Sequence, residues 1–402
     1  MRTGFLLLAI LLISSASARA EKPAPAPEPA GIAATVARLQ RIQVEDSETR
    51  VPAAARPLLA ALKNQIRDLL ARELRDVAGP SAVAGIAPER LRADLIRAFA
   101  RAGVTVGGPE TNGAGPYGDI AGLDVRKPAG HENLLAVRVT LGIACGSDTS
   151  LYLFQRREGV WRPAFSLESQ GYAEISGAMG IFDFGVSPPD PSGSFFVVAA
   201  DVNPSCASNW QRLRWRVWRL GGETPPSKPF FEGQEGIYLG SDDTLQLAVT
   251  ADGFRVSFQG YQGLDTGVLV RDYVRAYRVR GTQAERVPPL ATEPEGFLDE
   301  WIGTPWADAR RWTGPKAASA EVWHGRLAKR FDKIDTAFDS FEVCGKERSR
   351  WQIGLDLDPD PGRNPLPRAL FFTVSRQGAD FRLDRIDVRP LPGCVAAATP
   401  NP

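Results

Sequence analysis

The chain has 402 residues, with 48 Lys and Arg against 47 Asp and Glu, and its formal net charge is +1. A balance this even argues against a broad electrostatic commitment to nucleic acid or to an anionic membrane surface. With 43% hydrophobic residues, including 9 Trp and 19 Phe, the chain can bury a sizeable core. Its length is typical of two or three domains.

The first residues have the pattern of a secretory signal peptide. Arg2 precedes an apolar run from Phe5 to Ile13, and Ala18-Arg19-Ala20 is a small-x-small cleavage site. We expect residues 1–20 to be removed, with an uncleaved N-terminal anchor as the alternative. The apolar run is shorter than the about 20 residues of a transmembrane helix, and no later segment is apolar enough to span a membrane. The predicted location is therefore the periplasm or the extracellular space.

Helical patterns dominate the next part of the chain. Residues 21–30, EKPAPAPEPA, predict an extended Pro/Ala linker. Residues 31–103 predict a helical module of three apolar stripes, the last of which begins at Pro88 and ends at Gly103. None of these helices carries a side-chain cluster suited to catalysis, so we expect them to pack or to present a partner surface.

Residues 104–292 predict a repeated antiparallel β domain. A strand from Leu134, a turn at Cys145 and a returning strand that ends in Phe154 form one unit, and the pattern recurs twice. The aromatic anchors Phe154, Trp218 and Tyr277 are 64 and 59 residues apart. A period near 60 with about four strands per unit is typical of propeller blades. Only three copies are apparent here, so a sandwich or an incomplete propeller-like stack remains an alternative.

Residues 293–395 predict a small α+β domain. Short helices follow Pro294 and Pro305, and strand-like segments come after them. Ala369-Leu-Phe-Phe372 repeats the aromatic pattern, so this part is either a fourth unit after a helical insertion or a separate domain. Residues 396–402 are expected to be a disordered tail. The fold class is thus α+β with a mainly β core.

Four cysteines in an exported chain favour two disulfides. Cys145 and Cys206 occupy the same turn of neighbouring units, and Cys344 and Cys394 bracket the last strands. The repeat therefore predicts the pairs Cys145–Cys206 and Cys344–Cys394. This pairing also argues against Cys145 as a nucleophile.

The sequence predicts no catalytic residue from a local motif. Only His131 and His324 could serve as the base of a Ser–His–Asp or Cys–His site. Neither lies in an H-E-x-x-H motif, and the chain contains no G-x-S-x-G motif.

Two further motifs are weak. Gly113-Ala-Gly115-Pro-Tyr-Gly118 spells G-x-G-x-x-G, but the internal proline and the strand expected after it predict a loop rather than a dinucleotide site. Asp356, Asp358 and Asp360 alternate as in a calcium loop, yet the glycine is one place late and Pro367 stands where an EF-hand has Glu. We therefore predict an acidic turn, no metal and no cofactor.

Clustered tryptophans and arginines each have two interpretations. Exposed tryptophans could stack on sugar rings, but helical spacing favours core anchors; these are Trp301, Trp306, Trp312 and Trp323. Alternating arginines on one strand favour a solvated face with acidic partners over a polyanion groove; these are Arg212, Arg214 and Arg216.

Two functions follow as hypotheses. The first is an exported, non-catalytic binding protein of the cell envelope or extracellular space, with an unknown protein, peptide or glycan as partner. The second is a secreted glycoside hydrolase that uses paired carboxylates, about 5 to 9 Å apart in a cleft beside exposed Trp. We favour the first, because no motif pairs the available acids, namely Asp183, Asp201, Asp242, Asp243, Asp299 and Glu300.

Overall fold

The structure is a computed structural model that describes residues 31–43, 49–76, 87–107, 117–206, 208–222, 226–240, 245–263, 270–317, 319–329, 336–357 and 367–396. The predicted signal peptide, residues 1–20, and the linker, residues 21–30, lie outside the described residues. The described part confirms the α+β class with a mainly β core of four-stranded antiparallel units.

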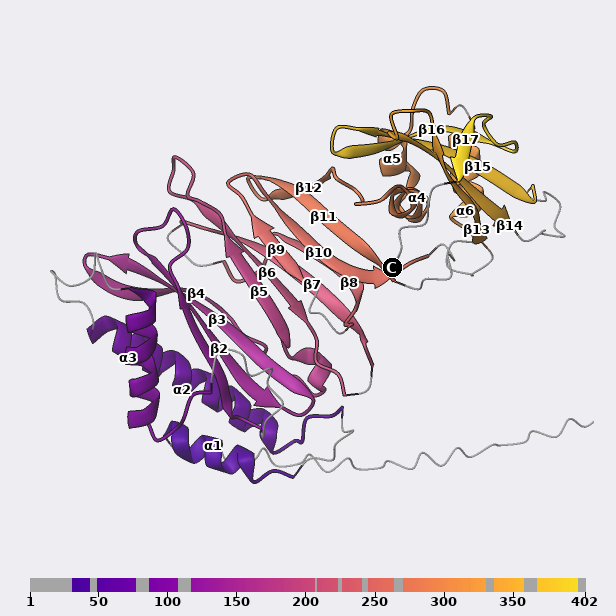
Figure 1. Ribbon diagram of the computed structural model, residues 1–402. Helices are drawn as coiled ribbons and strands as arrows, with labels where there is room; N and C mark the ends of the chain where they lie inside the picture. Colours follow the sequence, from indigo (N-terminus) through magenta and orange to yellow (C-terminus); the bar gives the residue numbers. More distant parts are fainter. Residues whose placement is uncertain are drawn as a thin grey trace, which may run out of the picture.

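Three N-terminal helices cover one face of the first sheet (Figure 1). They are α1 (Ile32–Gln40), α2 (Ala55–Asp76) and α3 (Pro88–Arg101). Their apolar stripes are buried; Leu39, Leu62 and Phe99 are each 0% exposed. These residues share one hydrophobic cluster with strands of the first sheet. The helical module is therefore a layer on the β domain and has no separate core.

Three antiparallel sheets follow, each with its strands paired in chain order. The first contains β1 (Ile120–Arg126), β2 (Leu134–Ile143), β3 (Gly146–Arg157) and β4 (Val160–Leu167). The second contains β5 (Ile181–Val186), β6 (Phe195–Val202), β7 (Trp210–Leu220) and β8 (Phe231–Tyr238). The third contains β9 (Gln246–Val249), β10 (Gly253–Tyr261), β11 (Val270–Arg280) and β12 (Gln283–Val287).

The three sheets are stacked face to face in a row (Figure 1). Because side chains alternate along a strand, each sheet can bury both faces. In β3, Leu153 packs toward the second sheet while Phe154 packs toward the helices. In β7, Trp218 packs toward the first sheet while Trp215 packs toward the third. The row is open, with the helices at one end, so the incomplete propeller-like stack is the better of the predicted alternatives.

The predicted aromatic anchors occupy equivalent places in the stack. Phe154, Trp218 and Tyr277 lie on the third strand of their sheets, and each faces the layer that precedes it in the chain. The sequence period of about 60 residues thus marks successive layers.

The C-terminal part has a core of its own. Its sheet repeats the same meander in β13 (Thr336–Cys344), β14 (Arg350–Leu357), β15 (Ala369–Gln377) and β16 (Asp380–Asp387), and β17 (Cys394–Ala396) is added beside β13. Helices α4 (Pro294–Gly303), α5 (Trp306–Ala309) and α6 (Ala320–Leu327) pack on this sheet. Phe372, the fourth anchor, is buried among them. The expected tail begins one residue too early, since Ala396 belongs to β17; residues 397–402 lie outside the described part.

Disulfides join both predicted pairs of cysteines. Cys145–Cys206 links the β2–β3 turn of the first sheet to the β6–β7 loop of the second. Cys344–Cys394 joins directly paired residues of β13 and β17. In the described residues, no helix has both the length and the hydropathy to cross a bilayer.

Candidate functional site

An exposed aromatic cluster lies where the second and third sheets meet. Trp210 begins β7, Tyr238 ends β8 and Tyr261 ends β10. Trp210 and Tyr238 are direct cross-strand partners with ring centroids 5.0 Å apart, and the Tyr261 ring is 6.1 Å from that of Trp210. Trp210 is 39% exposed and Tyr261 is 45% exposed. We call these three residues the aromatic platform.

Local hydrogen bonds hold the platform in place. The Ser208 hydroxyl oxygen accepts a bond of 3.0 Å from the Trp210 amide. Asn203 accepts from the Arg212 amide at 2.7 Å, and its side-chain amide donates to Gln211 at 2.9 Å. The Cys145–Cys206 disulfide anchors the same loop to the first sheet. Trp210 is therefore preorganised, although it starts a strand beside a loop.

A shallow hollow of about 590 Å³ lies beside the platform and is lined by Trp210. Apart from Trp210 its lining is mostly polar side chains that can donate or accept hydrogen bonds. We call it the platform hollow; its lining residues are Ser176, Asn203, Trp210, Gln211, Arg212, Gln234, Glu235 and Gly236.

A second hollow of about 400 Å³, here named the disulfide cleft, lies beside Cys145. It is bounded by β2, β3, the start of β5 and the β6–β7 loop. Gly146 and Gly180 let Pro204 approach closely: a Cβ on Gly146 would lie 2.9 Å from the Pro204 Cβ, and one on Gly180 would lie 3.2 Å from its Cγ. Side chains in place of these hydrogens would force the loop outward and change the shape of the cleft.

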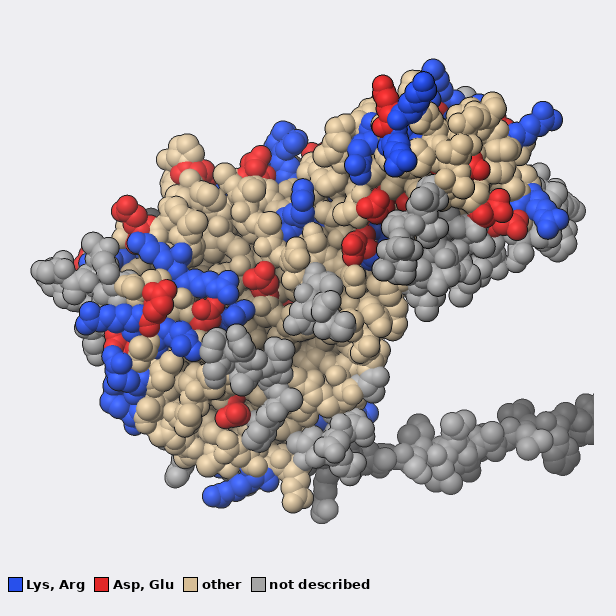
Figure 2. Space-filling model, viewed as in Figure 1, with Lys and Arg blue, Asp and Glu red and all other residues tan. Residues whose placement is uncertain are grey.

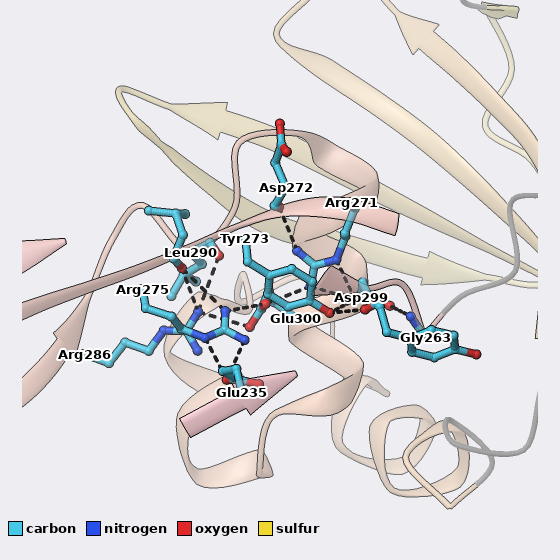
Figure 3. A network of polar contacts seen from close by, with 12 residues as sticks. Glu235, Gly263, Arg271, Asp272, Tyr273, Arg275, Arg286, Leu290, Asp299 and Glu300 are labelled. Carbon is cyan, nitrogen blue, oxygen red and sulfur yellow. Dashed lines mark hydrogen bonds and ion pairs between the residues drawn. The ribbon is translucent and has the colours of Figure 1, made fainter. Parts of the chain in front are cut away.

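A third hollow, the junction cavity, lies between the third sheet and α4 and measures about 480 Å³. Glu300 on α4 lines the cavity and lies in the network of polar contacts drawn in Figure 3. The Glu300 carboxylate accepts bonds from Arg275 at 2.6 Å, Arg271 at 2.8 Å and Arg286 at 3.1 Å. Burial acts to raise the pKa of Glu300, but the charges of these arginines outweigh it and lower the pKa to about 2.

The neighbouring acids of the junction cavity are also bound. Asp299 accepts from Arg271 Nε at 2.7 Å and from the Gly263 amide at 3.0 Å. Glu235 on β8 accepts from Arg275 at 2.9 Å. The structure thus brings together Asp299 and Glu300, two of the acids named for the hydrolase hypothesis. A carboxylate with a pKa near 2 is ionised at neutral pH, so Glu300 cannot serve as a general acid there.

The two other predicted acids that the structure describes, Asp183 and Asp201, are not gathered into a cleft. Asp201 is 0% exposed and forms ion pairs with Arg214 at 2.7 Å and Arg216 at 2.6 Å. Two of the three alternating arginines on β7 therefore have the predicted acidic partner. The third, Arg212, instead donates to the Ser176 carbonyl. Asp183 lies on β5 and accepts from the Phe184 amide. Asp242 and Asp243 lie outside the described residues.

Both histidines have structural partners. His131 Nε2 lies 2.8 Å from the Ser187 carbonyl oxygen, and its ring packs on Phe195. His324 is 4% exposed, lies 2.8 Å from the Thr304 carbonyl and packs edge-on against Trp301. Cys145, the possible nucleophile, is in a disulfide. The described residues therefore contain no triad built on either histidine.

Of the other sequence motifs, the tryptophans lie in or against the core, and the acidic turn and the glycine-rich segment are described only in part. Trp301 is 0% exposed, and the three other clustered tryptophans pack against the same core, so the prediction of core anchors is confirmed. Of the three aspartates of the predicted acidic turn, Asp356 lies in β14, while Asp358 and Asp360 lie outside the described residues. Of the G-x-G-x-x-G segment, only the last two residues are described; they form a turn before β1.

Sequence reasoning missed the aromatic platform. Its members lie 28 and 23 residues apart on three strands, so no local spacing joins them. One signal was available: Trp210 stands among Ser, Asn and Gln at the start of a strand, where a core aromatic would have apolar neighbours at alternate positions.

Comparisons with known proteins leave the family open. No family model matches the sequence, and no curated protein matches it. One similar solved structure is a complex of BT0996 with RGII, at 10% identity over 74% of this protein and 82% of the other, with a TM-score of 0.24. Another is the GH43 beta-1,3-galactosidase BT3683 with galactodeoxynojirimycin, at 8% identity over 70% of this protein and 79% of the other, with a TM-score of 0.23. Likeness at these TM-scores establishes neither a shared fold nor a shared function.

Proposed function

We propose that the protein is an exported, non-catalytic carbohydrate-binding protein and that the aromatic platform is its docking surface. The observation that carries this proposal is the exposure of Trp210 and Tyr261, whose rings neighbour each other beside the half-buried Tyr238, next to a hydrogen-bonded loop. The faces of pyranose rings carry C–H groups that stack on aromatic rings, and sugar hydroxyls bond to side-chain amides and guanidinium groups. The platform hollow offers both kinds of partner side by side.

Export is supported by two independent features. The N-terminus has the pattern of a signal peptide. All four cysteines form disulfides, which persist in oxidising compartments. N-terminal sequencing of exported protein should begin at Glu21, and recovery of Met1 in the membrane fraction would contradict it.

A binding role fits the platform better than glycoside hydrolysis. Two carboxyl groups must flank the scissile bond in most glycosidases. Among the described residues that line the platform hollow, Glu235 is the one carboxylate, and it is held by Arg275. The carboxylate pair at the junction cavity is neutralised by arginines.

The test is affinity gel electrophoresis with soluble cellulose derivatives, xylan, mixed-linkage glucan, galactan and polygalacturonate. At least one polysaccharide should retard the protein, and Trp210→Ala should abolish the retardation, because the central ring of the platform is removed. Trp210→Phe should retain part of it. Val322→Ala, which truncates a side chain that is 62% exposed on α6, should leave it unchanged.

Three results would count against the proposal. They are an absence of retardation by every polysaccharide, retardation that Trp210→Ala does not change, and release of new reducing ends from the bound polysaccharide. The last would restore the hydrolase hypothesis. Trp210-dependent binding of proline-rich peptides with no polysaccharide binding would identify the platform as a peptide site instead.

A further inference from the structure

We infer that the ligand is an extended chain of several sugar residues that lies on the platform and continues into the disulfide cleft. This inference rests on the proposed function and adds a direction and a length to it. It does not follow from the platform alone, because three rings could equally bind a single terminal sugar.

The platform hollow and the disulfide cleft adjoin each other. Asn203 and Gln211 line both of them. The two side chains are bonded to each other at 2.9 Å and come from the loop and strand that carry Trp210. A glycan that leaves the platform over this pair enters the cleft beside Cys145 without crossing a layer of the fold.

The chemistry of the cleft suits sugar hydroxyls. Its lining combines hydroxyl and amide side chains with a few apolar ones, and its volume of about 400 Å³ is within the range of small-ligand sites. The polar side chains include Thr140, Ser147, Ser208, Asn209 and Gln211, and the apolar ones include Phe182 and Leu239.

The opposite direction is less open to a neutral glycan. Glu235 lines both the platform hollow and the junction cavity, and its carboxylate is bonded to Arg275 at 2.8 Å. A ligand on that side would disturb a buried arginine that also holds Glu300. The ligand is therefore expected to extend from Trp210 toward the disulfide and away from α4.

The cleft is also preformed, which favours binding of several linked units. The disulfide and the close approach of Pro204 to Gly146 and Gly180 fix the spacing between the cleft and the platform. A polymer that fits both places gains the second contact at little further cost in entropy.

A length series tests the inference. Fragments from mono- to hexasaccharide, prepared from the polysaccharide that retards the protein, are titrated by calorimetry. Affinity should rise at least about tenfold between disaccharide and hexasaccharide. Ser147→Trp, which fills the cleft, should remove this rise while leaving the affinity for the disaccharide unchanged. The matched control is Ser166→Trp, at an exposed position of β4, which should retain the rise.

A second variant covers the case in which Ser147→Trp fails to fold. Asn209 is exposed and lines the cleft but not the platform hollow. Asn209→Ala should reduce hexasaccharide affinity and spare the disaccharide.

The outcomes separate the two proposals. Trp210-dependent binding with equal affinity for all lengths would overturn the extended ligand and retain the platform. A rise with length that neither cleft variant reduces would place the extra contacts elsewhere and overturn the assigned direction. Absence of binding at every length would instead overturn the carbohydrate function itself.

Discussion

The side chain of Lys63 is one of the most buried charges in the described residues. It is 1% exposed on α2, and its Nζ lies 2.5 Å from the carboxylate of Asp148, which is 0% exposed. Nζ also donates to the Ser169 carbonyl at 2.7 Å and to its hydroxyl at 2.9 Å. Tyr172 donates to Asp148 at 2.8 Å. The charge pair is thus fully bonded and ties the helices to the first sheet.

We expect Lys63→Met to destabilise the protein by about 3–5 kcal/mol, because it leaves Asp148 buried without its counter-charge. Urea unfolding followed by tryptophan fluorescence measures this loss. Lys63→Met combined with Asp148→Leu should cost less than the sum of the single variants. Arg97→Ala is the control: it breaks an exposed pair with Asp94 and should change stability by less than about 1 kcal/mol. Equal effects of Lys63→Met and Arg97→Ala would refute this account.

At the scale of elements, the Cys145–Cys206 disulfide serves two purposes. It joins the turns of neighbouring sheets across a sequence separation of 61 residues, and it fixes the loop that carries Trp210. The second disulfide, with a separation of 50 residues, joins strands within the C-terminal sheet and lies far from the platform along the chain.

Replacing both cysteines of either pair with serine should lower stability by about 4 kcal/mol, since the two closed loops are of similar length. Only Cys145→Ser with Cys206→Ser should also weaken polysaccharide binding, because only that pair positions the platform loop. Calorimetric melting and affinity electrophoresis of the two double variants measure both effects. Equal loss of binding in both would show that the disulfides act through global stability alone.

The sequence predicted those features that depend on a pattern within a single strand. Phe154, Trp218 and Tyr277 mark the third strand of each layer, and their spacing predicted the repeated four-stranded units and, with them, the Cys145–Cys206 pair. Sequence reasoning failed for contacts between layers. Tyr261 reaches Trp210 only because the second and third sheets stack, and the arginines around Glu300 come from two strands of the third sheet. Such sites depend on how the sheets are placed relative to one another, and no short sequence pattern indicates that placement.

At the scale of the whole molecule, the junction around Glu300 connects the stack to the C-terminal part. The acid comes from α4, and its three arginine partners come from β11 and β12. On the face drawn in Figure 2, basic and acidic side chains are interspersed. The joint between the two parts therefore depends on buried charges, in contrast to the apolar contacts between the sheets.

This joint predicts a specific acid sensitivity. The pKa of Glu300 is about 2 in the folded protein against an ordinary value of 4.5. The unfolded protein therefore binds this proton more readily, and the stabilisation, about 3 kcal/mol, is present above pH 4.5 and is lost as pH falls toward 2. Glu300→Gln should be less stable than the parent at pH 7, and the difference should shrink over that window.

Denaturant unfolding at several pH values measures the difference. Glu321→Gln, an exposed acid on α6, is the matched control and should follow the parent at every pH. A difference between parent and Glu300→Gln that stays constant from neutral to acid pH would mean that Glu300 has the same pKa in the folded and the unfolded protein, and would contradict the lowered pKa.

The aromatic anchors face the layer that precedes them in the chain, and this affects the order in which the chain can fold. Each of Phe154, Trp218 and Tyr277 packs on a layer made of residues that precede it. When a sheet emerges from a ribosome or an export channel, the layer on which it packs has therefore already emerged. In a closed propeller the first sheet also packs on the last one, so its apolar face stays exposed until the whole chain has emerged. In this open row of sheets, the apolar face left exposed at each stage is that of the sheet that emerged last. The layers can therefore pack one after another as the chain emerges from its N-terminus.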